Sequence, residues 1–269
     1  MDDEGQRGGA GSAAVMALAG AVLLFLIAPV VIIVIVSFSG ADYLSFPPPH
    51  LSLRWYQRFL GASSWRQAIW VSTQVALLTM VFATTLGLLA ALALVRGRFR
   101  GKGAIYAVML SPMIVPTVIT AIGLYFFFVR LKATGSVLAM ALGHTVLALP
   151  VVVIIMAAAL QGFDMRLEQA ALSLGASRLT ALRRITLPLI LPGLLSAALF
   201  AFLTSFDELL IPLFLSGVEV QTLTVRIWNS LTLEVDPTIA AVSSFLIGVT
   251  TVVLAASALL RGRGGATTT

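Results

Sequence analysis

Long apolar runs separated by short charged islands organise this sequence. A membrane-spanning helix needs about 20 apolar residues, and six runs meet that length. They occupy residues 13–36, 67–95, 104–129, 133–163, 185–215 and 237–260. The charged residues gather between the runs and leave no segment for a separate water-soluble core. We therefore predict an all-α, polytopic membrane protein with six transmembrane helices, forming a single domain over residues 1–269.

The first apolar run follows a short tail, residues 1–12. A secretory signal peptide is an alternative reading, but its apolar region covers only roughly 7 to 15 residues. Because this run is longer, we expect an uncleaved first helix.

The positive charges indicate how the helices are oriented. With six spans both termini share one side, which carries 11 of the 17 Lys and Arg residues, against six on the other side. The positive-inside rule therefore places both termini and residues 1–12 in the cytoplasm. The net charge of +6 follows from this bias, and we expect no nucleic-acid partner because the basic residues lie beside apolar spans without interleaved aromatic residues.

The segment between the first two runs contains a further helical pattern. Leu53, Tyr56 and Leu60 recur at helical spacing. We expect a short helix at the outer membrane interface, with its aromatic side chains at headgroup depth.

A small polar insert lies between the fourth and fifth runs, with the sequence EQAALSLGASRLTALRRITLP over residues 168–188. Residues 168–174 favour a helix that Gly175 can end in a left-handed conformation. Ser177 is a candidate N-cap for a second helix over 178–186, and Pro188 fits the first turn of the next span. The pattern alone fits a docking surface for another protein and an ordinary basic loop equally well.

The insert resembles the cytoplasmic EAA loop of the membrane subunits of binding-protein-dependent ABC importers. The family pattern is Glu-Ala-Ala, three residues, Gly, nine residues, Ile, any residue and Leu-Pro. The positions that take its places are Gln169, Ala170, Ala171, Gly175, Ile185, Leu187 and Pro188. Gln169 replaces the glutamate of the pattern, and Glu168 lies one residue earlier. The resemblance implies a coupling helix that sits in a cleft of the ATP-binding subunit, where Gln169 would form a neutral hydrogen bond.

The resemblance extends along most of the chain. The segments that carry it are SLRWYQRFL, LSPMIVPTVITAIGLYFFF, GHTVLALPVVVIIMAAALQGFD and SFDELLIPLFLSG. They are similar to the permeases of spermidine/putrescine-type importers, a branch that also handles other small solutes such as opines and aminophosphonates. The resemblance implies a type I permease of the bacterial inner membrane with a MetI-like fold. It also implies a second permease in a heterodimer, two ATP-binding subunits and an extracytoplasmic solute-binding protein.

Several polar or helix-breaking residues fall within the apolar runs. Asp207 and Glu208 lie in the fifth run, where a carboxylate costs about 2.5 to 3.5 kcal/mol to insert. They line a path for a cationic solute, or they lie near the outer interface and pair with Arg130, Lys132 or a partner subunit. Both readings stay open.

Proline and histidine residues mark further positions in these runs. Pro112 and Pro116 in the third run, and Pro150 in the fourth, remove backbone hydrogen bonds and predict kinks. Such kinks can open and close a path or can be purely structural; we favour the solute path for Pro112 and Pro116 and a structural role for Pro150. His144 has no second intramembrane histidine beside it, so we expect a hydrogen-bonded structural role.

The loop between the fifth and sixth runs lies on the outer side in this topology. Its polar and aromatic residues are candidates for contact with the solute-binding protein. They are Glu219, Trp228, Glu234 and Asp236.

The sequence lacks the common catalytic and phosphate-binding motifs. It has no GxxxxGK[ST], HExxH, CxxC or GxSxG pattern and no cysteine. We therefore expect no enzyme, catalytic residue, metal site or cofactor in this chain, with ATP and Mg²⁺ bound by the partner ATPase. A secondary transporter is the other class considered, but we find no inverted repeat between the two halves.

Overall fold

The computed structural model describes residues 4–233 and 237–265, and these residues form helices without a β-strand. An isolated bridge joins Ser39 and Leu51. The larger helices are α1 (Glu4–Ser37), α3 (Ser63–Arg96), α5 (Thr117–Arg130), α6 (Val137–Gln161), α9 (Leu187–Phe206), α11 (Leu223–Leu233) and α12 (Thr238–Gly265). The shorter ones are α2 (Arg54–Gly61), α4 (Lys102–Leu110), α7 (Met165–Ser173), α8 (Arg178–Ala181) and α10 (Leu210–Leu215). The all-α prediction is confirmed.

The chain divides into two units, which are described separately. One contains Met1–Ala62 and Asn229–Val249, and the other contains Ser63–Trp228 and Thr250–Thr269.

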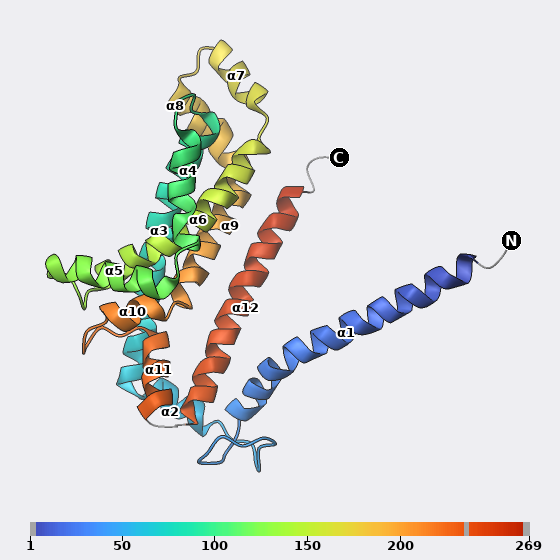
Figure 1. Ribbon diagram of the computed structural model, residues 1–269, viewed down its shortest axis with the longest axis vertical. Coiled ribbons are helices and arrows are strands. Elements are labelled where there is room, and N and C mark those ends of the chain that lie inside the picture. The colour runs from blue at the N-terminus through green and yellow to red at the C-terminus, as the bar shows by residue number, and fades with distance from the viewer. Residues whose placement is uncertain (1–3, 234–236, 266–269) are drawn as a thin grey trace. The chain divides into compact units, whose positions relative to one another are not determined.

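The core of the second unit is a bundle of α3, α6 and α9, which run side by side in Figure 1. Small residues line the contacts, and Ala91, Ala148 and Ala197 are fully buried. A Cβ added at Gly87 would lie 2.4 Å from Cγ1 of Val152, so the two helix backbones approach too closely for a larger residue. Close packing through small residues is typical of helices in membranes, where water does not drive association.

The first unit is organised around α2 and the loop before it. Trp55 and Phe59 are the buried residues of α2, and the Phe59 ring lies 5.6 Å from that of Phe245. The expected short helix is present, and Leu53 and Leu60 of the predicted pattern are 57% and 55% exposed. The large apolar rings of Trp55 and Phe59 are buried in the protein, whereas the prediction placed the aromatic side chains at headgroup depth.

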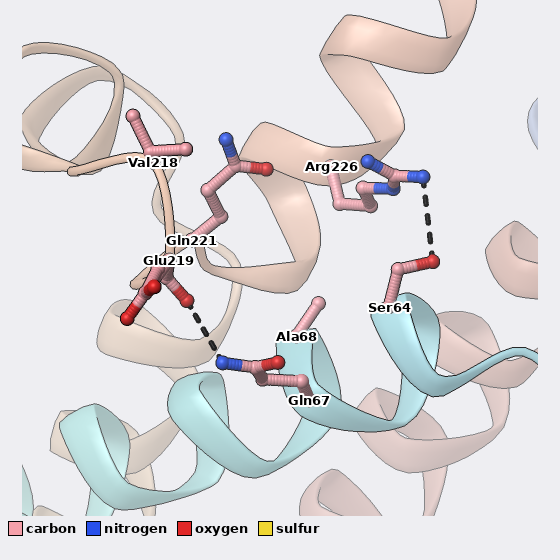
Figure 2. Close-up of a pocket in the computed structure, with 7 residues that line it drawn as sticks. All are labelled: Ser64, Gln67, Ala68, Val218, Glu219, Gln221 and Arg226. Carbon is pink, nitrogen blue, oxygen red and sulfur yellow. Dashed lines mark hydrogen bonds between the residues drawn. The ribbon is translucent and has the colours of Figure 1, made fainter.

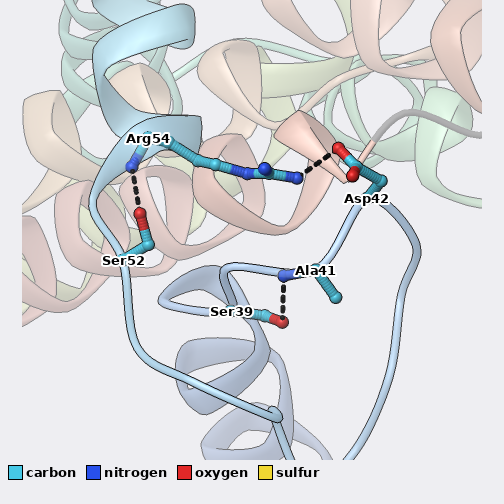
Figure 3. Close-up of polar contacts among 5 residues, drawn as sticks. All are labelled: Ser39, Ala41, Asp42, Ser52 and Arg54. Carbon is cyan, nitrogen blue, oxygen red and sulfur yellow. Dashed lines mark hydrogen bonds and ion pairs between the residues drawn. The ribbon is translucent and has the colours of Figure 1, made fainter.

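Polar contacts fix the loop that leads into α2 (Figure 3). Arg54 forms an ion pair with Asp42, and its backbone N–H donates to Oγ of Ser52 at 3.2 Å. The backbone N–H of Ala41 donates to Oγ of Ser39, also at 3.2 Å. The Asp42 side chain is 87% exposed, so this ion pair lies at the surface.

Within the described residues, five segments are long and apolar enough to cross a membrane. They are Val15–Ser37, Ser63–Arg96, Val137–Gln161, Arg178–Phe206 and Thr238–Ala258. A sixth span results if Lys102–Met113 and Thr117–Arg130 count as one, although they are bent by 99° at the break between them. The runs predicted at 13–36, 67–95, 133–163 and 237–260 match helices closely.

In the other two runs the helix is interrupted. Pro112 and Pro116 predict the bend in the third run, whereas no residue predicts the break in the fifth. The third run, 104–129, breaks between α4 and α5, where Pro116 precedes the first residue of α5. The fifth run, 185–215, is wrong as a single helix because α9 ends at Phe206 and α10 begins at Leu210. Hydropathy averages over such short breaks and does not detect them. In contrast, α6 continues through Pro150.

Candidate functional site

Residues 165–188, called the EAA-type segment below, form a helix, a turn and a second helical start. Asp164 caps α7 by accepting the Arg166 N–H at 2.9 Å. At the other end Gly175 has a φ of +88°, and the N–H of Ala176 donates to the carbonyl of Ala171 at 3.0 Å. This closing pattern is a Schellman motif, which favours glycine because a Cβ is strained at positive φ.

The second part of the segment leads directly into α9. The hydroxyl of Ser177 accepts the Thr180 N–H at 3.2 Å, which confirms the predicted N-cap. The separate helix predicted over 178–186 is wrong, because α8 passes through a π-helical turn, Leu182–Thr186, into α9 without a break. Pro188 lies in the first turn of α9, directly after the π-helical turn.

One side of the EAA-type segment is open. Gln169, Ala170 and Gly175 are exposed, and Leu174 is 89% exposed. Ala171, Ile185 and Leu187 are half-buried, and Pro188 is exposed. The open side therefore presents small and apolar groups together with the neutral Gln169 amide, and the exposed Arg166 lies one helical turn before them.

Glu168 points the other way, into the protein. It is 9% exposed and forms an ion pair with Arg96, whose Nη1 lies 2.8 Å from Oε2 of Glu168. The hydroxyl of Thr186 donates to the same oxygen at 2.7 Å. Sequence reasoning missed Arg96 and Thr186, because Arg96 lies 72 positions before Glu168 and reads as one more residue of a basic island.

The predicted path residues lie at the two helix breaks. Pro112 and Pro116 border the break between α4 and α5, and Ile114 between them is 84% exposed. Asp207 follows the last residue of α9 and is exposed. Oε1 of Glu208 accepts the N–H of Leu210 at 2.7 Å, so this carboxylate caps α10.

These positions revise the reading of the two carboxylates. Neither lies inside a continuous helix, because the chain breaks at them. Among the described residues, neither forms an ion pair with Arg130 or Lys132. Glu208 therefore has a local structural partner, whereas the side chain of Asp207 is exposed.

His144 belongs to a buried polar cluster that joins three helices. Its Nδ1 lies 2.7 Å from Oγ of Ser205 on α9, and that hydroxyl donates to Oγ1 of Thr79 on α3 at 3.2 Å. All three residues are buried. The expected hydrogen-bonded histidine is confirmed.

A polar pocket of about 460 Å³ lies between the start of α3 and the chain from α10 to α11 (Figure 2). Its lining residues are Ser64, Gln67, Ala68, Val218, Glu219, Gln221 and Arg226. The side chain of Gln67 donates to the carbonyl of Glu219 at 2.9 Å, which ties the loop to α3.

The guanidinium of Arg226 in this pocket contacts neutral groups. Nη2 of Arg226 lies 3.4 Å from Oγ of Ser64, and its guanidinium lies 5.5 Å from the Trp65 ring. Sequence reasoning named Glu219 but missed Arg226. Trp228 is 43% exposed. Glu234 and Asp236 lie outside the described residues.

Comparison with known proteins places this geometry in a family. Residues 83–263 match the family described as "Binding-protein-dependent transport system inner membrane component". The chain belongs to this family. As an inner membrane component of a binding-protein-dependent transport system, it is a multi-pass permease subunit of an ABC importer.

Individual relatives of this inner membrane component cover most of its length. The spermidine/putrescine transport system permease protein PotC of Haemophilus influenzae is 34% identical over 227 residues, which are 84% of this chain and 88% of that protein. The putrescine transport system permease protein PotI of Escherichia coli K12 is 33% identical over 231 residues, 83% of this chain and 82% of that one.

A solved structure supports the fold of this inner membrane component. A chain of a bacterial ABC transporter involved in importing the acidic polysaccharide alginate superposes with a TM-score of 0.72. The match covers 97% of this chain and 98% of that chain at 16% identity. At this identity the likeness concerns the fold.

Proposed function

We propose that this permease subunit serves the ATP-driven uptake of polyamines such as spermidine and putrescine. The observation that carries the proposal is the similarity to PotC and PotI over more than four fifths of the chain. The exposed carboxylate of Asp207 at a helix break supports it, because a polyamine is a cation and needs anionic or polar groups to replace part of its hydration. Pro112 and Pro116 would border the same path.

The proposed complex contains a second permease, two ATP-binding subunits and an external solute-binding protein. The open side of the EAA-type segment is the surface proposed for the ATP-binding subunit, which would hold ATP and Mg²⁺. Both termini would then be cytoplasmic, and residues 1–269 would act as one permease domain. We expect the chain itself to catalyse no reaction.

The pocket lined by Glu219 and Arg226 is proposed to contact the solute-binding protein. In the proposed topology the pocket lies on the outer side. Its lining offers a carboxylate and a guanidinium, which suit polar side chains of a transient partner, since such interfaces are rich in charge-complementary contacts. Trp228 adds an exposed aromatic group, a residue type that is enriched at interfaces.

Uptake by the whole complex tests the substrate. The chain is expressed with its partner subunits in cells that lack other polyamine uptake, and entry of labelled putrescine and spermidine is measured. We expect ATP-dependent uptake that an excess of unlabelled polyamine abolishes. Uptake that is competed by an opine or an aminophosphonate, but not by polyamines, would assign the importer to another solute.

A further inference from the structure

The EAA-type segment is fastened to the membrane bundle by a small buried cluster of Arg96, Glu168 and Thr186, called the latch below. Arg96 is the last residue of α3, Glu168 lies in α7, and Thr186 ends the π-helical turn before α9. The latch therefore joins three parts of the chain that are far apart in sequence.

The polar groups of the latch form a closed ring. Nη1 of Arg96 lies 2.8 Å from Oε2 of Glu168 and donates to Oε1 at 3.2 Å. Nη2 of Arg96 donates to Oγ1 of Thr186 at 3.2 Å, and this hydroxyl donates to Oε2 of Glu168 at 2.7 Å. Each member contacts the other two, so the ring specifies one arrangement of the three elements.

The latch is shielded from water. The side chains of Arg96 and Glu168 are only 19% and 11% exposed, and Thr186 is fully buried. The Arg96 guanidinium also lies 5.7 Å from the Phe163 ring, in the link between α6 and α7. A charge in such a site is strongly unfavourable without its partner, because burial removes its hydration. The ion pair therefore opposes separation of α7 from the end of α3.

The two faces of α7 differ in their surroundings. The exposed face, with Gln169 and Ala170, is free for another subunit, whereas the face with Glu168 is tied to α3 and to the start of α9. Force applied to the exposed face can reach α9 through the continuous helical chain, whereas its path to α3 runs through the attachment of the buried face to Arg96. Contiguous hydrogen-bonded and packed elements carry such coupling.

We propose that Arg96 and Glu168 are positioning residues that make the EAA-type segment move with α3 and α9 as one rigid body. This inference rests on the proposed function, in which an ATP-binding subunit docks on that segment. The latch transmits the movement and makes no contact with ATP or solute. Loss of the latch should therefore uncouple ATP hydrolysis from uptake.

The test uses the complete complex in proteoliposomes with its solute-binding protein. Arg96→Gln and Glu168→Gln are compared with wild type for uptake and for ATP hydrolysed per solute imported. We expect the ratio of ATP to solute to rise about tenfold in each variant, within the range typical of coupling between sites. Only complexes that co-purify with both ATP-binding subunits are assayed, so the ratio reports coupling instead of assembly.

A matched control breaks an exposed ion pair. Asp42→Asn removes the partner of Arg54 at the surface and should leave the ratio unchanged. The swap Arg96→Glu with Glu168→Arg addresses the case in which the single variants do not assemble. If the swap assembles and restores at least half of the coupled uptake, the latch is supported.

Two results would overturn the latch. The first is that Arg96→Gln or Glu168→Gln hydrolyses as little ATP per imported solute as wild type. The second applies if the single variants fail to assemble, and it is that the charge-swapped double variant shows no uptake. Failure of the proposed function looks different. In that case the wild-type complex itself shows no ATP hydrolysis that responds to the solute-binding protein.

Discussion

Ser205 and His144 are joined by a hydrogen bond of 2.7 Å that links α9 to α6 in the core of the bundle. The hydroxyl of Ser205 also donates to Oγ1 of Thr79 on α3, so this one group forms hydrogen bonds with two other helices. Since all three residues are buried, no water replaces a lost partner.

The first prediction concerns this cluster. Ser205→Ala leaves Nδ1 of His144 and Oγ1 of Thr79 without this partner, and a buried polar group without a hydrogen bond costs about 1 to 3 kcal/mol. We expect a lower thermal unfolding temperature of the purified complex in detergent. The neighbouring Thr204→Ala is the control, because Thr204 donates to the carbonyl of Phe200 in its own helix. Equal unfolding temperatures for both variants would contradict a joining role for Ser205.

The sequence predicts this protein well where a signal is local. Gly175 and Ser177 cap the EAA-type segment as their residue types indicate, and apolar length alone locates the membrane helices that have no break. These features depend on a few neighbouring residues or on average hydropathy, and both are visible in one sequence.

The features that sequence reasoning missed depend on residues that are distant in the chain. Nothing near Glu168 reveals that it turns inward to Arg96, because an exposed and a buried glutamate look alike in a helical pattern. The break at Asp207 was hidden for a different reason. Its apolar neighbours on both sides keep the average hydropathy high while Glu208 starts a new helix.

The second prediction separates Asp207 from Glu208. Asp207→Asn removes an exposed charge that forms no ion pair within the described residues, so we expect uptake of a cationic solute to fall by about tenfold with assembly intact. Glu208→Ala removes the acceptor that caps α10 and should mainly lower stability, by about 0.5 to 2 kcal/mol as for other caps. Uptake rates and thermal unfolding of the same preparations distinguish the two effects. Wild-type uptake in Asp207→Asn would remove this residue from the path.

The third prediction concerns the pocket of Figure 2. Arg226→Glu reverses the charge beside Ser64 and places a second carboxylate near Glu219. If an external solute-binding protein docks there, its stimulation of ATP hydrolysis should require about tenfold more of that protein, because reversing a charge destroys its complementarity to the partner surface.

A control variant distinguishes an effect on docking of the solute-binding protein from an effect on folding of the permease. Arg226→Gln retains a side chain that can donate to Ser64, so it should assemble as well as wild type and show a smaller loss. Titrating the solute-binding protein against ATPase activity measures the shift. Identical titrations for wild type and Arg226→Glu would exclude the pocket as a docking surface.

The last prediction concerns Gln169, which stands where the EAA pattern has glutamate. Gln169 is exposed, whereas Glu168 beside it is buried against Arg96, so the two residues face different neighbours. Gln169→Glu adds a charge to the open side of α7 without disturbing the latch. If the ATP-binding subunit has been matched to a neutral amide, uptake and the stimulated ATPase should both fall by about fivefold, the lower end of typical coupling effects. Gln169→Ala is the control, since it removes the amide without adding charge. A gain in uptake from Gln169→Glu would instead show that the ATP-binding subunit retains a basic partner for the family's glutamate.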